Sequence, residues 1–119
     1  MSDFNSLTAS ELGDMIGQGE IDPVELTEHF LSRIQASPIG KKIYSTVTSQ
    51  LALEQAKDAK KRAISGRRLS SLDGVPISWK DLFDIKGYPC EAGSELLAGR
   101  LANQNCEVYD LAEAQGLIC

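Results

Sequence analysis

The spacing of apolar residues predicts two helices at the start of the chain, each with its own start signal. Thr8-Ala9-Ser10-Glu11 is a capping box, in which the threonine hydroxyl and the glutamate carboxylate each accept a hydrogen bond from a backbone N–H. Leu12, Met15 and Ile16 then supply one apolar face, and glycine ends this short helix.

The second helix has the stronger start signal, Asp22-Pro23-Val24-Glu25. Asp22 suits the N-cap, Pro23 fits the first helical position, and Glu25 is placed to complete a capping box. The helix stops at Ser37-Pro38-Ile39-Gly40, because the residue before a proline is biased away from helical geometry. Its predicted buried stripe is Leu26, Phe30, Leu31 and Ile34.

A strand and a third helix are predicted next. Residues 43–48 are rich in β-branched side chains, which favours a strand. Leu51 to about Ile64 has helical spacing with Ser49 as its cap, and its exposed faces include Asp58 and Arg62, spaced for a weak surface pair. Small residues on one face would let this helix lie close against a neighbour: Ala52, Ala56, Ala59 and Ala63.

The stretch from Leu72 to Gly93 is the centre of the predicted fold. The turn signal Asp73-Gly74 precedes a short apolar strand, Val75–Trp79, which ends abruptly at Lys80-Asp81. Strand alternation places Val75, Ile77 and Trp79 on one face and Pro76, Ser78 and Lys80 on the other. A lysine facing inward at the end of a buried strand is neutral, paired with an acid, or at the mouth of a site.

The remaining pattern predicts a helical turn at Ser94–Ala98, a helix and a final strand. Asn105 is the expected cap of the helix, which carries Val108, Leu111 and Ala112, and residues 117–119 begin the strand. Strand, loop, helix and strand form a βαβ unit with parallel strands.

The predicted fold class is α/β, consisting of N-terminal helices and the start of a mixed or parallel sheet. A parallel sheet needs helices over both of its faces, and strands usually run about five or six residues. Three short strands and roughly four helices give too little sheet for a complete α/β domain. We therefore expect residues 1–119 to form a single partial domain, truncated relative to a larger α/β protein.

Composition narrows the function classes. A net charge of -5 disfavours direct binding of nucleic acid or anionic membranes. No signal peptide or membrane span is apparent, and three cysteines without CxxC spacing indicate reduced thiols in a cytoplasmic protein. With one histidine and no glycine-rich phosphate motif, we expect neither a metal site nor a cofactor.

Lys80 is the strongest catalytic candidate. To act as a general base near neutral pH, a lysine needs its pKa lowered by about three units, which burial or a nearby cation can supply. The alternative is an ordinary lysine paired with a carboxylate. Ser78, two residues earlier, and Ser94, on a turn, are weaker nucleophile candidates, and His29 is expected to be exposed and without a role.

The sequence Leu72-Asp-Gly-Val-Pro-Ile-Ser-Trp-Lys-Asp-Leu-Phe-Asp-Ile-Lys-Gly87, followed by Ala92-Gly93-Ser94, closely resembles the amidase signature family. The resemblance covers the N-terminal portion of that family only. It implies an α/β C–N hydrolase with a Ser–cis-Ser–Lys triad, acting on a small amide substrate through an acyl-enzyme. It also implies that Lys80 is the triad lysine, and that Ser78 is not the nucleophile.

The family's Gly/Ser-rich segment, which carries both triad serines and the oxyanion loop, has no counterpart in residues 1–119. We therefore expect the chain to be inactive alone, with Lys80 as its only catalytic residue and its substrate-binding residues unknown. Two alternatives stay open: part of the A component of a tRNA-dependent amidotransferase, or a non-enzymatic truncated product. Exposed apolar surface and strand edges also predict self-association.

Overall fold

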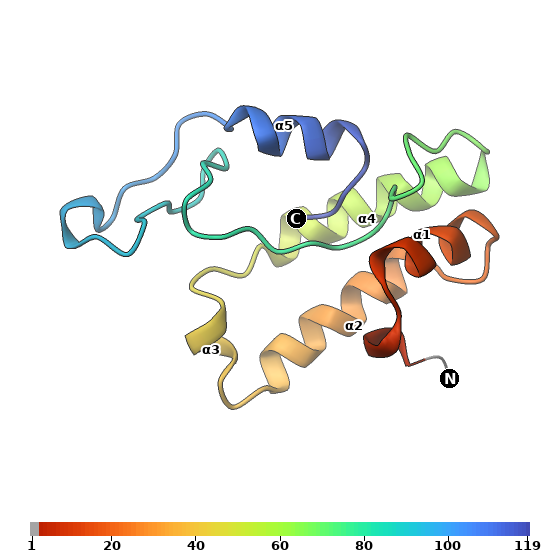
Figure 1. The fold of residues 1–119 in the computed structure, drawn as a ribbon, viewed down its shortest axis with the longest axis horizontal. Coiled ribbons are helices and arrows are strands. Elements are labelled where there is room, and N and C mark those ends of the chain that lie inside the picture. Colours follow the sequence, from red (N-terminus) through yellow and green to blue (C-terminus); the bar gives the residue numbers. More distant parts are fainter. Residues whose placement is uncertain (1–2) are drawn as a thin grey trace.

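A computed structural model describes residues 3–119, and its regular structure over that range is helical (Figure 1). The elements in chain order are η1 (Phe4–Ser6), α1 (Ala9–Gly17), α2 (Pro23–Ala36), α3 (Gly40–Ile43), α4 (Ser49–Ile64), η2 (Glu95–Leu97) and α5 (Glu107–Ala114). The two long helices, α2 and α4, pack against each other, and the chain after α4 runs alongside this pair to α5.

The predicted start signal of α1 is confirmed, and that of α2 is confirmed in its cap and its proline, although Glu25 completes no capping box there. In the capping box of α1, the Glu11 amide donates to the Thr8 hydroxyl at 3.2 Å, and the Thr8 amide donates to the Glu11 carboxylate at 2.7 Å. At α2, the Asp22 carboxylate accepts from the Val24 amide at 2.8 Å, and Pro23 occupies the first turn. Such a cap contributes about 1 kcal/mol to helix stability.

The predicted stripe of small residues on α4 is also confirmed. Ala52, Ala56 and Ala59 are buried, so α2 can approach this face closely. The predicted cap is wrong: α4 begins at Ser49 itself, and the preceding Thr48 makes no side-chain cap. The Thr48 hydroxyl donates instead to the Cys119 carbonyl oxygen at 2.7 Å, which ties the start of α4 to the end of the described chain.

The larger of two apolar clusters in residues 3–119 lies between α1, α2 and the chain that follows α4. Its buried members come from four different segments: Leu12, Ile16, Ile21, Leu26 and Val75. Burying a side chain of this size is worth about 1.5–3 kcal/mol relative to leaving it exposed. This cluster therefore fixes the position at which the 75–80 segment begins.

The predicted strand at residues 43–48 is wrong. Ile43 ends the short helix α3, residues 44–48 have no regular structure, and Val47 is exposed. β-branched residues favour a strand only where a pleated neighbour covers them, and no strand pairs with this segment in residues 3–119.

The parallel direction predicted for the strands at 75–79 and 117–119 is correct, although no sheet forms among the described residues. Pro76 and Ile118 make one parallel bridge, in which the Ile77 amide donates to the Ile118 carbonyl at 2.8 Å and the Ile118 amide to the Val75 carbonyl at 3.0 Å. Of the expected α/β fold, the described residues therefore show one parallel backbone contact, and α5 lies in the chain between its two partners.

The helical turn predicted at residues 94–98 is present as η2, but α5 differs from its prediction in both cap and buried face. Cys106, not Asn105, is the N-cap, because the Asn105 side chain accepts from the Lys86 amide at 2.7 Å and donates to Asp110. The buried residue is Tyr109, which lies outside the predicted set, whereas Val108 and Leu111 are more than half exposed.

Residues 90–101 form an arm that projects from the helices, on the left of Figure 1. At its base, the Cys90 amide donates to the Arg100 carbonyl, and Arg100 forms an ion pair with Asp84 at 2.7 Å. Leu96, at the tip, is 96% exposed. The arm helps to explain why the radius of gyration, 14.8 Å, exceeds the value of about 13.5 Å expected for a compact domain of this length.

Candidate active-site cleft

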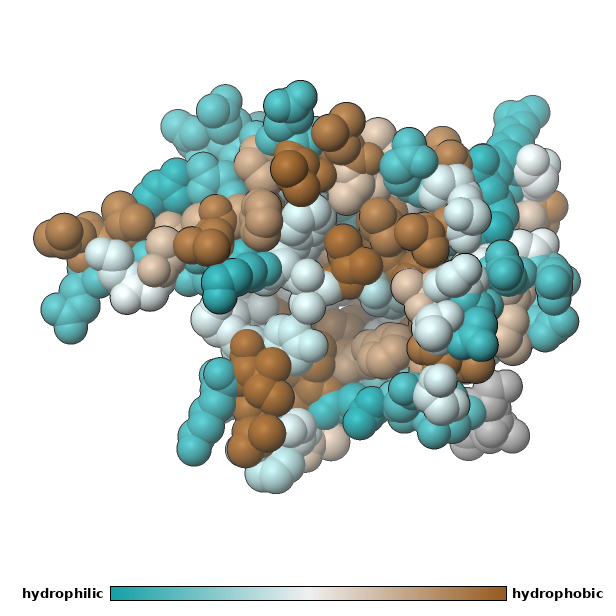
Figure 2. Space-filling view, viewed as in Figure 1, coloured by the Kyte–Doolittle hydropathy of each residue, from teal (hydrophilic) through white to brown (hydrophobic). Residues whose placement is uncertain are grey.

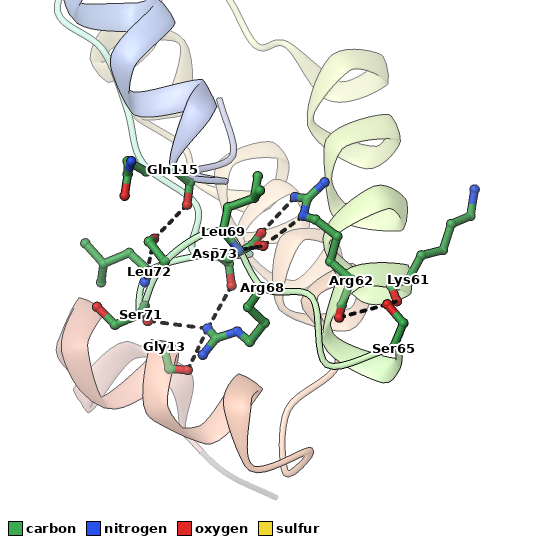
Figure 3. A network of polar contacts seen from close by, with 11 residues as sticks. Gly13, Lys61, Arg62, Ser65, Arg68, Leu69, Ser71, Leu72, Asp73 and Gln115 are labelled. Carbon is green, nitrogen blue, oxygen red and sulfur yellow. Dashed lines mark hydrogen bonds and ion pairs between the residues drawn. The ribbon is translucent and has the colours of Figure 1, made fainter.

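A buried carboxylate positions the segment that leads to Lys80 (Figure 3). Asp73, only 1% exposed, accepts two hydrogen bonds of 2.8 Å from the Arg62 guanidinium and a third from the Leu69 amide. These bonds satisfy the buried charge and raise the pKa of Arg62. The surface pair predicted between Asp58 and Arg62 is therefore wrong.

Arg68 and Ser70 extend this network to α1 and to the end of α5. The Arg68 guanidinium donates to the carbonyl oxygens of Gly13 and Asp73, and the Ser70 hydroxyl donates to that of Gln115 at 2.7 Å. The loop before residue 75 is thus held by helices on both sides. The sequence pattern did not predict this network, because its partners are far apart along the chain.

An open cleft of about 510 Å³ lies beside the 75–80 segment. Its walls are α2, residues 43–48 and residues 76–81, with the last two residues of the chain also contributing. The face in Figure 2 is hollowed near its centre, where α2 and the chain above it face one another in Figure 1. Apolar side chains such as Phe30, Ile34 and Trp79 form much of its lining.

Lys80 lies on the rim of this cleft and is exposed, so the prediction of a lysine facing inward in a buried position is wrong. Of the alternatives, the structure supports a lysine at the mouth of a site. Lys80 forms no ion pair within residues 3–119, and the neighbouring Asp81 carboxylate accepts from the Glu91 amide at 3.1 Å. Val75, on the opposite strand face, is buried as the alternation predicts.

The weaker candidates do not join Lys80 in a catalytic arrangement. Ser78 is exposed on the same cleft wall, with no hydrogen bond from its hydroxyl to Lys80 among the described residues. Ser94 precedes η2 in the arm and does not line the cleft. His29, predicted to be exposed, is half-buried between the rings of Phe4 and Phe30, and it hydrogen bonds with the Asn5 side chain.

One polar residue in the cleft had no signal in the sequence. Thr27 lines the cleft from α2 and is 2% exposed, yet its hydroxyl has no hydrogen-bond partner among the described residues. A buried hydroxyl without a partner costs about 1–3 kcal/mol. Within the described range, no group of three potential ligands could hold a metal ion, and no helix is long and apolar enough to cross a membrane.

Sequence comparison matches the chain to known proteins over nearly its whole length. The sequence model of the Amidase family matches residues 25–119. The A chain of the glutamyl-tRNA(Gln) amidotransferase of Acinetobacter baylyi is 37% identical over 118 residues, which cover 99% of this chain and 24% of that protein. The corresponding protein of Thioalkalivibrio sulfidiphilus is 39% identical, and the match covers 92% of this chain and 22% of that protein.

Solved structures agree in fold. A structure described as a vestigial protein complex, which reveals the evolutionary origins of an s-triazine catabolic enzyme, superposes with a TM-score of 0.84 and 25% identity, covering 94% of this chain and 25% of that chain. The native peptide amidase from Stenotrophomonas maltophilia gives a TM-score of 0.80 at 22% identity, covering 98% of this chain and 24% of that chain.

These neighbours are α/β enzymes of the amidase signature class, and the fold around Lys80 is theirs. The chain belongs to the amidase family. It spans about a quarter of the length of the curated relatives it matches.

Proposed function

We propose that this chain supplies the N-terminal segment of an amidase-type C–N hydrolase, with Lys80 as the base of a Ser–cis-Ser–Lys triad. One observation carries the proposal: Lys80 ends the extended segment on the rim of the 510 Å³ cleft, inside the region that matches the Amidase family. The sheet that would complete the α/β fold around it is part of the same proposal.

The proposed role requires Lys80 to accept a proton. A neutral lysine amine would take the proton of the intermediate serine, which in turn would deprotonate the nucleophilic serine as it attacks the amide carbonyl. Polypeptide that covers the rim would remove water from around Lys80, which is the environment that this role requires. Residues 1–119 offer one member of the triad, so we expect no turnover from this chain alone.

The substrate class that fits the family is a small amide. A second candidate is the A component of an amidotransferase that serves tRNA transamidation, favoured by relatives of that name at 37% and 39% identity. In either case, a cytoplasmic location fits the three cysteines, which form no disulfide. We propose no direct contact with nucleic acid because the chain is acidic, and a tRNA would be held by a partner protein.

A chimera tests the role of Lys80. Residues 25–119 replace the matching segment of the Acinetobacter baylyi relative, and ammonia release is measured on an amide that this host hydrolyses. We expect the folded chimera to turn over, and Lys80→Met to reduce kcat by about 10²–10⁴-fold. Lys86→Met is the matched control, because Lys86 is exposed and outside the 510 Å³ cleft.

Activity that survives Lys80→Met in a folded chimera would show that this lysine is not the base. The isolated 119-residue chain is assayed in parallel on small aliphatic and aryl amides. Ammonia release that disappears with Lys80→Met in the isolated chain would contradict the expectation that it is inactive.

A further inference from the structure

Lys80 lies between two aromatic residues that contact each other. Trp79 comes directly before it, and the rings of Trp79 and Phe83 meet edge to face, with centroids 5.2 Å apart. The turn between them is closed by the Lys80 carbonyl oxygen, which accepts from the Leu82 amide at 2.7 Å and from the Phe83 amide at 3.2 Å. The backbone of Lys80 is therefore held by its neighbours on both sides.

Tyr109 on α5 supports this aromatic pair. Its ring lies against the ring of Trp79, with centroids 5.5 Å apart and an interplanar angle of 60°. Tyr109 is 3% exposed, and its hydroxyl accepts a hydrogen bond from the Gln55 side chain at 3.1 Å. Burial raises the pKa of this hydroxyl, so it stays neutral. Trp79 therefore packs on a buried ring whose polar end is bonded.

Gln55 in α4 fixes the position of the Tyr109 hydroxyl. The side-chain nitrogen of Gln55 also donates to the Glu113 carboxylate at 3.2 Å, and its side-chain oxygen accepts from the Cys119 amide at 2.9 Å. Since nitrogen only donates and oxygen only accepts, these bonds together define one orientation of the amide group. The two helices α4 and α5 are thus joined at Tyr109.

Two further contacts bring the chain after Lys80 to the start of α5. The Cys106 amide donates to the Asp84 carbonyl oxygen at 2.8 Å. The Lys86 amide donates to the Asn105 side chain at 2.7 Å. Together with the tryptophan contact, these bonds attach the chain on both sides of Lys80 to the same helix. They use no atom of the lysine side chain, which lies on the rim of the cleft.

We propose that Tyr109 is a positioning residue for Lys80 and acts through the ring of Trp79. The proposal rests on the proposed function for the role of Lys80 as a base, and it gives Tyr109 no contact with substrate. A lysine amine is carried on a flexible four-carbon stem, so its placement begins with a fixed backbone. Reacting groups need to be held within about 0.5 Å of their productive geometry. Loss of the tyrosine ring releases Trp79 and, with it, the backbone of Lys80.

Turnover by the chimera of residues 25–119 with the Acinetobacter baylyi relative tests this role. We expect Tyr109→Leu to lower kcat by about tenfold and to leave KM within about twofold, because a misplaced reacting group slows the chemical step. Tyr109→Phe keeps the ring, so its kcat should stay within about threefold of the parent value. Leu111→Ala is the matched control on the same helix, because Leu111 is 61% exposed.

A double substitution tests the route through Trp79. If Tyr109 acts through this ring, Trp79→Leu alone should lower kcat about as much as Tyr109→Leu, and the two substitutions together should cause little further loss. Additive losses would show that Tyr109 acts by another route. Trp79 is half-buried, so Trp79→Leu also carries the kcat test if circular dichroism shows that Tyr109→Leu does not fold.

The isolated chain gives a readout that needs no turnover. Trp79 is its single tryptophan, so fluorescence reports on this contact alone. In Tyr109→Leu we expect emission at longer wavelength, because the indole gains contact with water. NMR relaxation should show greater motion of the Lys80 amide in this variant, whereas the Val75 amide, in the apolar cluster, should be unchanged. A general loss of structure would affect both amides alike.

Two results would overturn the positioning role. One is an unchanged kcat in Tyr109→Leu while Lys80→Met inactivates the same chimera. The other is unchanged Trp79 emission and Lys80 amide motion in Tyr109→Leu. A folded chimera whose activity survives Lys80→Met removes the proposed function instead, and fluorescence and relaxation of the isolated chain then still decide whether Tyr109 holds Lys80 in place.

Discussion

The packed helices before residue 76 and the arm at residues 90–101 differ in what holds them. Both have well-formed local hydrogen bonds. In the first region apolar side chains are buried, as for Leu26 at 0% exposure, whereas Leu96 at the tip of the arm is 96% exposed. Turn chemistry and ion pairs can therefore set the path of a backbone in this chain, and the helical region adds a cluster of buried apolar side chains.

This contrast predicts where substitutions matter. In the helical region, buried side chains remove apolar surface from water or pair a buried charge. Substituting them therefore lowers the free energy of global unfolding. In the arm, side chains form ion pairs near the surface or stabilise turns. Substituting them therefore affects local opening of the arm. The apolar tip is visible as brown side chains at the far left of Figure 2, and such a patch favours association.

The largest effect is expected for Asp73→Asn. The amide cannot accept both bonds from Arg62, and it leaves that guanidinium without a counter-charge. Breaking a buried ion pair from one side costs about 3–5 kcal/mol, which urea unfolding measures. Asp58→Asn is the control, because its pair with Lys61 is 3.7 Å long and exposed, so a change within about 0.5 kcal/mol is expected. Equal effects would contradict the assignment of Asp73 as the residue that fixes this loop.

Two glycines with similar backbone angles compare the regions directly. Gly116 has φ +87° and Gly99 in the arm has φ +80°, so alanine is strained by about 1–2 kcal/mol at either position. A Cβ at Gly116 would also lie 2.2 Å from the Asp73 carboxylate oxygen, whereas a Cβ at Gly99 meets nothing within 4 Å.

Gly116→Ala should therefore destabilise the chain more than Gly99→Ala, by about 1–3 kcal/mol in urea unfolding. The difference isolates the contact with Asp73 from the backbone strain that both variants share. Equal losses at the two positions would show that the loop moves aside freely.

Sequence reasoning succeeded where neighbours along the chain decide the outcome. The capping box at Thr8 and the cap at Asp22 follow from residues two or three positions away, and the alanine stripe of α4 follows from helical periodicity. It failed where a distant partner competes. Asn105 is used by the Lys86 amide, and Arg62 by a carboxylate eleven residues away.

The candidate site was predictable in part for the same reason. Strand alternation and the motif singled out Lys80, and the mouth of a site was one of three surroundings that they left open for it. The exposure of Lys80 and the unpartnered hydroxyl of Thr27 depend on how distant segments of the described chain pack, and no local pattern encodes that. Residues 43–48 failed as a strand because pairing requires a second strand, whatever the β propensity of the segment.

The smallest effect is expected at the base of the arm and depends on pH. The Arg100 guanidinium holds the pKa of Asp84 at about 2, below its ordinary value of 3.8, with help from the Cys90 thiol. A lowered carboxyl pKa stabilises the folded arm above about pH 3.8, and this contribution is lost as the pH falls toward 2.

In an NMR titration, Asp84 should stay charged at about pH 3 in the native chain and be largely protonated there in Arg100→Gln, with faster exchange of the Gly99 amide. Arg67→Gln, at an exposed position outside the arm, should leave the Asp84 titration unchanged. Asp84 titrating near 3.8 in the native chain would mean that the ion pair does not hold the arm.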